Sequence, residues 1–154
     1  MFEEKSYISA LPFKNCNEST RSFLVRTRSF DDGTRVLGPI MCEPVPEEPN
    51  LKSIVLELEN KCNIIGIEEE YNIDADRFDY LGGYLNSGPV EDCKHIYTAG
   101  YSIDVSGLEE KTQEKGGSVE NKDIWFTEDE LIQHFFEERV HPGLLYLYVL
   151  FMSS

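Results

Sequence analysis

The distribution of apolar and polar residues along the chain predicts β-strands over much of its first third. Residues 22–30 (SFLVRTRSF) are rich in β-branched and aromatic side chains, which favours a strand. Asp31-Asp32-Gly33-Thr34 follows with the Asp-Gly chemistry of a tight turn. Residues 35–41 are predicted to return as a second strand that Gly38-Pro39 interrupts, whereas residues 1–19 have no clear period and are either an arm or a first strand.

The middle of the chain combines a proline-rich loop with two apolar segments. Residues 42–50 contain three prolines and are predicted to be a loop. The apolar, β-branched run 51–58 (LKSIVLEL) predicts a strand. Residues 62–71 (CNIIGIEEEY) predict a short helix with Ile64, Ile65 and Ile67 buried and the three glutamates outside.

Two further strands and a long polar segment follow. Residues 72–78 are predicted to be a turn, 80–85 and 94–105 are predicted to be strands, and 86–89 (NSGP) forms the loop between them. Residues 106–121 are polar, contain three glycines and have almost nothing to bury. We therefore expect a mobile loop there, which a protease cuts first near Lys111 or Lys115.

Helical signals dominate the C-terminal part. After a predicted strand at 123–126, Thr127 and Glu130 have the spacing of a capping box, which predicts a helix over 128–138. Its apolar stripe comprises Leu131, Ile132, Phe135 and Phe136. His141-Pro142 then opens a last helix, because proline is favoured at the first helical position.

That last helix carries an apolar run from Leu144 to Met152, nine residues that no single helical face can accommodate. The run is half the length of a membrane span, so it predicts a packed helix and no membrane association. Either most of its sides are buried or it contacts another chain, since large exposed apolar patches mark interfaces. A homo-oligomer formed through this helix is one expected outcome; the alternative is a core helix whose Tyr146 and Tyr148 turn their hydroxyls outward.

Length and charge limit the classes of function. The 154 residues, 40% of them hydrophobic, fit a single packed domain over 1–154. The net charge of −15 disfavours direct binding to free nucleic acid or to an anionic membrane. Arg21, Arg26, Arg28 and Arg35 form either a local basic patch or a strand pair with solvated basic side chains.

The four cysteines, Cys16, Cys42, Cys62 and Cys93, contain no CxxC pair and fit no zinc spacing. The N-terminal residues lack the pattern of a signal peptide. Reduced thiols in a cytoplasmic protein are the simplest interpretation.

Three segments together resemble the Nudix hydrolase family, in particular its group of ADP-ribose and UDP-sugar pyrophosphatases. FDYLGGYLNSGPVEDCKHIYTAGY is similar to the part that follows the catalytic helix, and ENKDIWFTEDELIQHFFEERVHPGLLYLYVLFM is similar to the family's ending. RSFLVRTRSF resembles the strand with a Val-x-Gln-x-Arg-like motif. The resemblance implies an α+β fold, an α/β/α sandwich around a mixed central sheet.

The defining Nudix box is degenerate in this sequence. In the family, Gly, five residues, Glu, seven residues and Arg-Glu-aliphatic-x-Glu-Glu-x-Gly place glutamates on one helical face, where they bind Mg²⁺. One alignment places Glu68 on the second residue of the Glu-Glu pair, with Ile64 and Ile67 at other glutamate positions. A second alignment places Glu57 in the Arg-Glu pair, with Asn60 and Lys61 in place of Glu-Glu. In both alignments about one of the metal-binding carboxylates survives.

The resemblance supplies the candidate site residues. Glu57, Glu68 and Glu69 are candidate metal ligands, and Glu68 and Glu120 are candidate catalytic residues. The simpler interpretation of Glu68, Glu69 and Glu120 is that they are solvated surface glutamates. The histidines, His95, His134 and His141, fall in different predicted elements, which favours structural roles.

The function expected from this pattern is a non-catalytic Nudix-like domain that binds a protein partner or a macromolecular complex, with a nucleotide as a further ligand and no cofactor. The alternative is a divergent Mg²⁺-dependent hydrolase of a nucleoside diphosphate-linked substrate such as ADP-ribose or a UDP-sugar. The number of carboxylates that converge around residues 57–70 and Glu120 distinguishes the two.

Overall fold

The computed structural model describes residues 5–17, 19–87, 95–110 and 121–154. The long and central strands are β1 (Lys5–Asn15), β2 (Arg21–Ser29), β3 (Arg35–Gly38), β4 (Ile40–Cys42), β8 (Phe78–Ser87), β9 (His95–Asp104) and β11 (Asn121–Thr127). The short strands are β5 (Ile64–Ile65), β6 (Glu68–Glu69), β7 (Asn72–Ile73), β10 (Glu109–Glu110) and β12 (Arg139–Val140). The helices are α1 (Asn50–Asn60), η1 (Ala75–Arg77), α2 (Glu128–Glu137) and α3 (Pro142–Ser153).

One mixed sheet organises the molecule. Its strand order is β12-β3-β2-β1-β9-β8, with β11 paired to β2 and β4 paired to β1. The β1–β9 and β12–β3 pairs are parallel, and the other pairs of this sheet are antiparallel. The expectation of a mixed central sheet is confirmed. For residues 5–15 the open choice between an arm and a first strand is settled, because β1 lies inside the sheet.

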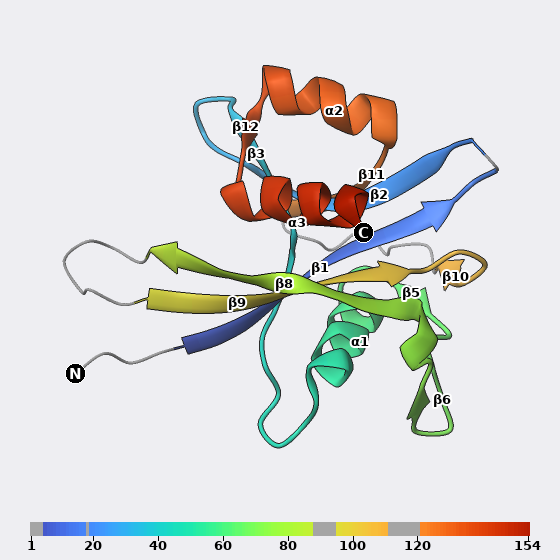
Figure 1. Cartoon of the computed structure of the whole chain (residues 1–154). Coiled ribbons are helices and arrows are strands. Elements are labelled where there is room, and N and C mark those ends of the chain that lie inside the picture. Colours follow the sequence, from blue (N-terminus) through green and yellow to red (C-terminus); the bar gives the residue numbers. More distant parts are fainter. Residues whose placement is uncertain (1–4, 18, 88–94, 111–120) are drawn as a thin grey trace.

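Helices cover both faces of this sheet, with α1 on one side and α2 and α3 on the other (Figure 1). Alternation along the strands produces the two layers, since successive side chains of a strand point to opposite faces. In β2, Leu24 belongs to the core under α1, while its neighbours Phe23 and Val25 belong to the core under α2 and α3. The α+β sandwich expected from the sequence is therefore confirmed.

The segment 51–58, predicted to be a strand, is instead most of α1. The buried residues of this helix include Ile54, Val55 and Leu58, which follow the three-to-four-residue spacing of one helical face. The strand prediction was wrong because it gave more importance to β-branched composition than to this period.

The helix predicted over 62–71 is also wrong. The chain there forms β5 and β6, and Gly66 between them has φ 103°, a left-handed conformation that interrupts any helix. The burial pattern was nevertheless anticipated in part, because Ile64 and Ile67 are fully buried and Glu69 and Glu70 are exposed.

Most other strands follow the sequence. The predicted strands at 22–30, 80–85, 94–105 and 123–126 correspond to β2, β8, β9 and β11. Gly38-Pro39 separates β3 from β4, as expected. Residues 88–94, which include Cys93, lie outside the described residues, and so does most of the predicted loop at 106–121, of which residues 106–110 and Asn121 are described.

The two C-terminal helices begin as predicted. Thr127 and Glu130 form the capping box of α2, with both reciprocal hydrogen bonds present. The apolar stripe of α2 is only partly internal, because Leu131 is fully buried but Phe136 is 88% exposed. Helix α3 packs on the sheet through Leu144 and Leu147, while Leu145, Val149 and Met152 remain exposed. Within the described part of the chain, no helix has the length and apolarity needed to span a membrane.

Candidate functional site

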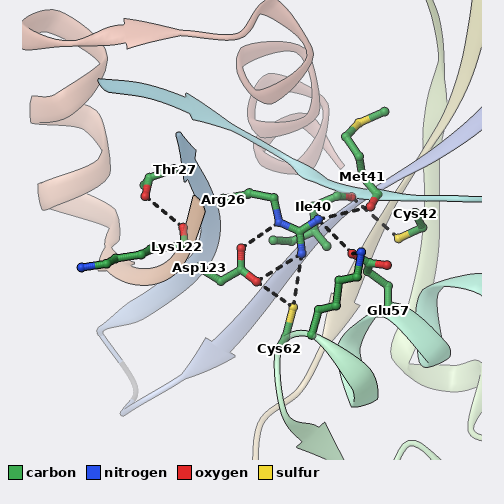
Figure 2. A network of polar contacts seen from close by, with 10 residues as sticks. Arg26, Thr27, Ile40, Met41, Cys42, Glu57, Cys62, Lys122 and Asp123 are labelled. Carbon is green, nitrogen blue, oxygen red and sulfur yellow. Dashed lines mark hydrogen bonds and ion pairs between the residues drawn. The ribbon is translucent and has the colours of Figure 1, made fainter. Parts of the chain in front are cut away.

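A part-buried cluster of charged groups joins α1 to the sheet, and Arg26 lies at its centre (Figure 2). Arg26 on β2 is directly opposite Asp123 on β11, so the strand register brings the two side chains together. Its Nε donates to Asp123 Oδ1 at 2.8 Å and its Nη2 donates to Oδ2 at 3.2 Å. Its Nη1 donates to Glu57 Oε1 of α1 at 2.9 Å and to the Met41 carbonyl at 3.4 Å.

The charges of this Arg26 cluster nearly cancel. The side chains of Arg26, Glu57 and Asp123 are 21%, 13% and 10% exposed, so all three are largely removed from water. Lys61 adds a second positive charge at 3.9 Å from Glu57 Oε1. Burial opposes the guanidinium charge, but the hydrogen bonds to Asp123 and Glu57 and the charge of Asp123 outweigh it and raise the pKa of Arg26. Both carboxylates are therefore neutralised by a cation that belongs to the chain.

Cys62, two residues after the end of α1, completes the cluster. Its Sγ donates to Asp123 Oδ2 at 3.3 Å and lies 4.0 Å from Arg26 Nη2. Burial first, and then the negative charge of Asp123, raises the pKa of the Cys62 thiol. A thiol binds a metal or reacts as a nucleophile only as thiolate, so Cys62 acts in this cluster as a hydrogen-bond donor.

The structure distributes the predicted site residues over separate contacts. Glu57 belongs to the Arg26 cluster, whereas Glu68 on β6 pairs with Lys52 in the first turn of α1. Lys52 and Glu57 are five residues apart, about 7.5 Å along the helix axis. Glu69 is exposed, and Glu120 lies outside the described residues.

Metal binding by Glu57, Glu68 and Glu69 and catalysis by Glu68 and Glu120 stay predictions. In the described ranges, no three or more histidine, cysteine or acidic side chains are grouped so that they can hold a metal ion. In the Arg26 cluster, a guanidinium already lies between the two carboxylates.

An open groove of about 860 Å³ lies beside β6 and β7. Its acidic lining residues are Glu69, Glu70 and Asp74, and the positive charge among its lining residues belongs to Arg77. Arg77 is held by Asp74 at 3.2 Å and donates to the Asp104 carbonyl at 2.9 Å. A diphosphate would therefore meet mainly negative charge here, and the groove is poorly suited to such a ligand.

The two alignments of the Nudix box make different demands on the backbone. The alignment centred on Glu68 needs a helix across residues 63–68, where the structure has β5 and β6, so it is wrong. The alignment on Glu57 needs a helix that ends shortly before a residue equivalent to glycine. Helix α1 ends at Asn60, and Asn63 has φ 59°, the left-handed conformation typical of glycine after a helix.

Sequence reasoning missed Arg26 and Asp123 as site residues. Neither a basic patch nor solvated side chains describes Arg26 and Arg35. Arg26 pairs with two carboxylates, and Arg35 pairs with Glu138. Arg28 is exposed and lies over the Phe30 ring at 5.2 Å. Ninety-seven residues separate Arg26 from Asp123, so no local sequence signal joins them.

The histidines have local structural contacts. His141 Nδ1 accepts from the Gly143 amide and caps α3, and burial lowers the pKa of His141. His134 lies against the Phe126 ring and 3.1 Å from Glu138. The side chain of His95 is outside the described part.

An α/β/α sandwich with a mixed central sheet is the class of fold that this geometry defines. No protein-family model matches the sequence, and no curated protein matches it. Solved structures do match the fold. A Nudix hydrolase from Nitrosomonas europaea is 10% identical, with TM-score 0.66, over 98% of this chain and 90% of that one.

Two further structures extend the match. The Nudix domain of Shewanella oneidensis NrtR, complexed with ADP-ribose, is 14% identical, with TM-score 0.59, over 96% of this chain and 86% of that one. A chain from the complex between the C-terminal domain of mouse MUTYH and human PCNA is 14% identical, with TM-score 0.55, over 98% and 89%. This protein has the Nudix fold.

Proposed function

We propose that residues 1–154 form one non-catalytic Nudix-like domain, which acts as a binding or interaction module and serves as a subunit or regulator of a larger assembly. The observation that carries this proposal is the Arg26 guanidinium, which is bound to both Glu57 and Asp123. Mg²⁺ needs several oxygen ligands in a regular geometry. A divalent cation at Glu57 would also meet a fixed positive charge 2.9 Å from its ligand oxygen.

The alignment compatible with α1 supports the loss of metal chemistry. With Asn63 at the box glycine, Glu57 falls in the Arg-Glu pair, and Asn60 and Lys61 replace the Glu-Glu pair. The helix then offers one of the family's carboxylates, and Arg26 and Lys61 compete for it. A cofactor-free domain is consistent with this arrangement.

Two fold neighbours support ligand or partner binding. One was solved with ADP-ribose and another in a complex with PCNA, so Nudix-like folds serve both kinds of contact. For this chain we favour a protein partner, because its charge of −15 and its acidic groove disfavour anionic ligands and free nucleic acid. The free thiols of Cys16, Cys42 and Cys62 agree with a cytoplasmic location.

The ADP-ribose complex of the neighbour also supports the alternative, a divergent Mg²⁺-dependent hydrolase of ADP-ribose or a UDP-sugar. That enzyme would need a metal site built from residues beyond the Arg26 cluster, such as Glu69 and Glu120. The first proposal explains the paired state of Glu57 and Glu68, and the alternative does not.

Turnover assays distinguish the two functions. The purified protein is incubated with ADP-ribose or UDP-glucose and Mg²⁺ or Mn²⁺, and release of AMP or UMP is measured against a blank. We expect no release above the blank. Turnover that Glu57→Gln or Glu68→Gln abolishes, and that the matched α1 variant Glu59→Gln retains, would overturn the non-catalytic proposal.

A further inference from the structure

Strand β8 forms a long free edge of the main sheet. It is the last strand in the sheet order and pairs with β9 on one side, and no other described strand pairs with it. The opposite end of the order is β12, which has two residues, whereas β8 has ten. A long edge strand offers unpaired backbone groups to another chain unless charges or a covering element protect it.

Very little charge protects this edge. Within β8 the one charged residue is Asp79, and α3 contains none. Over the whole chain 28% of residues are charged, and the net charge is −15. The β8 and α3 sequences are therefore a neutral region of a strongly acidic protein, where two copies can approach with little repulsion.

Helix α3 lies along β8, so the two elements form one continuous surface. Tyr146 donates its hydroxyl to the Gly83 carbonyl at 3.1 Å. Leu150 packs over Gly82, with Cδ1 3.2 Å from the point where a Cβ would lie. On the outside of α3, Val149 is 58% exposed.

The other face of β8 is also apolar. The Tyr97 side chain lies over Gly83, with its hydroxyl end at the position that a Cβ would take. Leu85, opposite Tyr97 in the register, is 65% exposed on this face. Tyr80 is 57% exposed, and its hydroxyl lies 3.2 Å from that of Tyr97. The edge is thus flanked by exposed apolar and aromatic side chains on both faces of the sheet.

We propose that the β8–α3 surface is a homodimer interface, in which residues 82–87 of β8 pair antiparallel with the same residues of a second copy and α3 packs beside its counterpart. A two-fold axis relates the same patch on both copies, and an antiparallel strand pair is self-complementary under that symmetry. The irregularity between Tyr80 and Gly82 limits the pairing to the residues that follow it.

A second copy fits this surface better than a charged partner. A basic partner would be attracted to the acidic parts of the protein. The β8–α3 surface has almost no charge and offers such a partner no electrostatic attraction. The inference rests on the proposed function in one respect, namely that the domain is an interaction module. Turnover is measured in a separate experiment. A protein that is monomeric and shows no turnover would contradict the dimer and leave the non-catalytic proposal standing.

The test compares three lysine variants of exposed apolar residues by light scattering and sedimentation over a wide range of protein concentration. The wild type should have twice the monomer mass of 17.7 kDa. Leu85→Lys and Val149→Lys each place like charges near the two-fold axis and should weaken the dimer at least about tenfold, which corresponds to about 1.4 kcal/mol. Phe136→Lys on α2, where Phe136 is 88% exposed, is the matched control and should remain dimeric.

Hydrogen exchange tests the strand pairing on the unmodified protein. Among residues 82–87, the backbone amides that point away from β9 should exchange faster on dilution, while those of β3 should not change. A wild type that is monomeric at every concentration overturns the proposal. The proposal is also wrong if the dimer persists in both Leu85→Lys and Val149→Lys with circular dichroism unchanged. It is equally wrong if Phe136→Lys loses the dimer to the same extent, or if hydrogen exchange in β8 does not depend on protein concentration.

Discussion

The guanidinium of Arg26 and the carboxylate of Asp123 form a two-point ion pair across directly opposed positions of β2 and β11. Two parallel hydrogen bonds between a guanidinium and a carboxylate fix the orientation of both groups and also pair their charges. Because Glu57 accepts from the remaining Nη1, Arg26 links α1 to two strands that are distant in sequence. The same contact that neutralises the candidate metal ligand therefore also holds the helix on the sheet.

Removing Arg26 should therefore destabilise the fold. Arg26→Ala leaves two largely buried carboxylates unpaired, and we expect a loss of about 3 kcal/mol in the free energy of unfolding, measured by urea denaturation. Combining it with Glu57→Gln and Asp123→Asn should recover part of the loss, because unpaired charge causes it. If the losses in unfolding free energy simply add up in the triple variant, the effect of Arg26→Ala comes from lost side-chain packing alone.

Helix α3 should make the stability depend on pH through His141. Its neutral Nδ1 accepts the Gly143 amide, and burial lowers the pKa of His141 from 6.5. The unfolded chain then binds the proton more readily, so this contribution is present above pH 6.5 and declines as the pH falls below it. His141→Asn keeps a capping acceptor without titrating, and its unfolding free energy should lose this part of the pH dependence; an unchanged profile would assign it to another group.

The capping box of α2 should contribute a measurable increment. Thr127→Ala removes the hydroxyl that accepts from the Glu130 amide, and we expect a cost of about 1 kcal/mol in chemical denaturation. Thr127→Ser retains the acceptor and should cost much less. Equal losses in both variants would indicate that the threonine methyl, and not the cap, is responsible.

Gly100 should tolerate no side chain. A Cβ there would lie 2.2 Å from Leu147 Cδ2 and 3.1 Å from the Gly82 carbonyl oxygen, so Gly100→Ala pushes α3 away from the sheet. We expect a loss of about 1–3 kcal/mol. Gly38→Ala, where a Cβ would make only ordinary contacts, 3.7 Å from His141 Cβ and 3.9 Å from the Arg26 carbonyl oxygen, is the matched control and should cost much less. If Gly100→Ala unfolds at the wild-type denaturant midpoint, α3 adapts freely and the close approach has no energetic role.

The strands and caps that could be predicted from the sequence depend on local chemistry. The Thr127–Glu130 spacing, His141-Pro142 and the turn after β2 are all decided within a few residues. The site could not be predicted in this way, since Arg26, Glu57 and Asp123 meet only after α1 and β11 have packed on β2. The α1 segment shows a different failure, because its helical period was present in Ile54, Val55 and Leu58 but composition pointed to a strand.

The parallel pairing of β1 with β9 has a consequence for how the chain acquires its structure. Lys5 is in register with Ile96 and Phe13 with Asp104, so this central contact closes a loop of about ninety residues. Closing a loop of this length costs chain entropy before the strand pairing can stabilise the structure. Sheets dominated by such distant contacts fold in milliseconds to seconds. During synthesis, β1 therefore waits without its parallel neighbour until about two thirds of the polypeptide has left the ribosome.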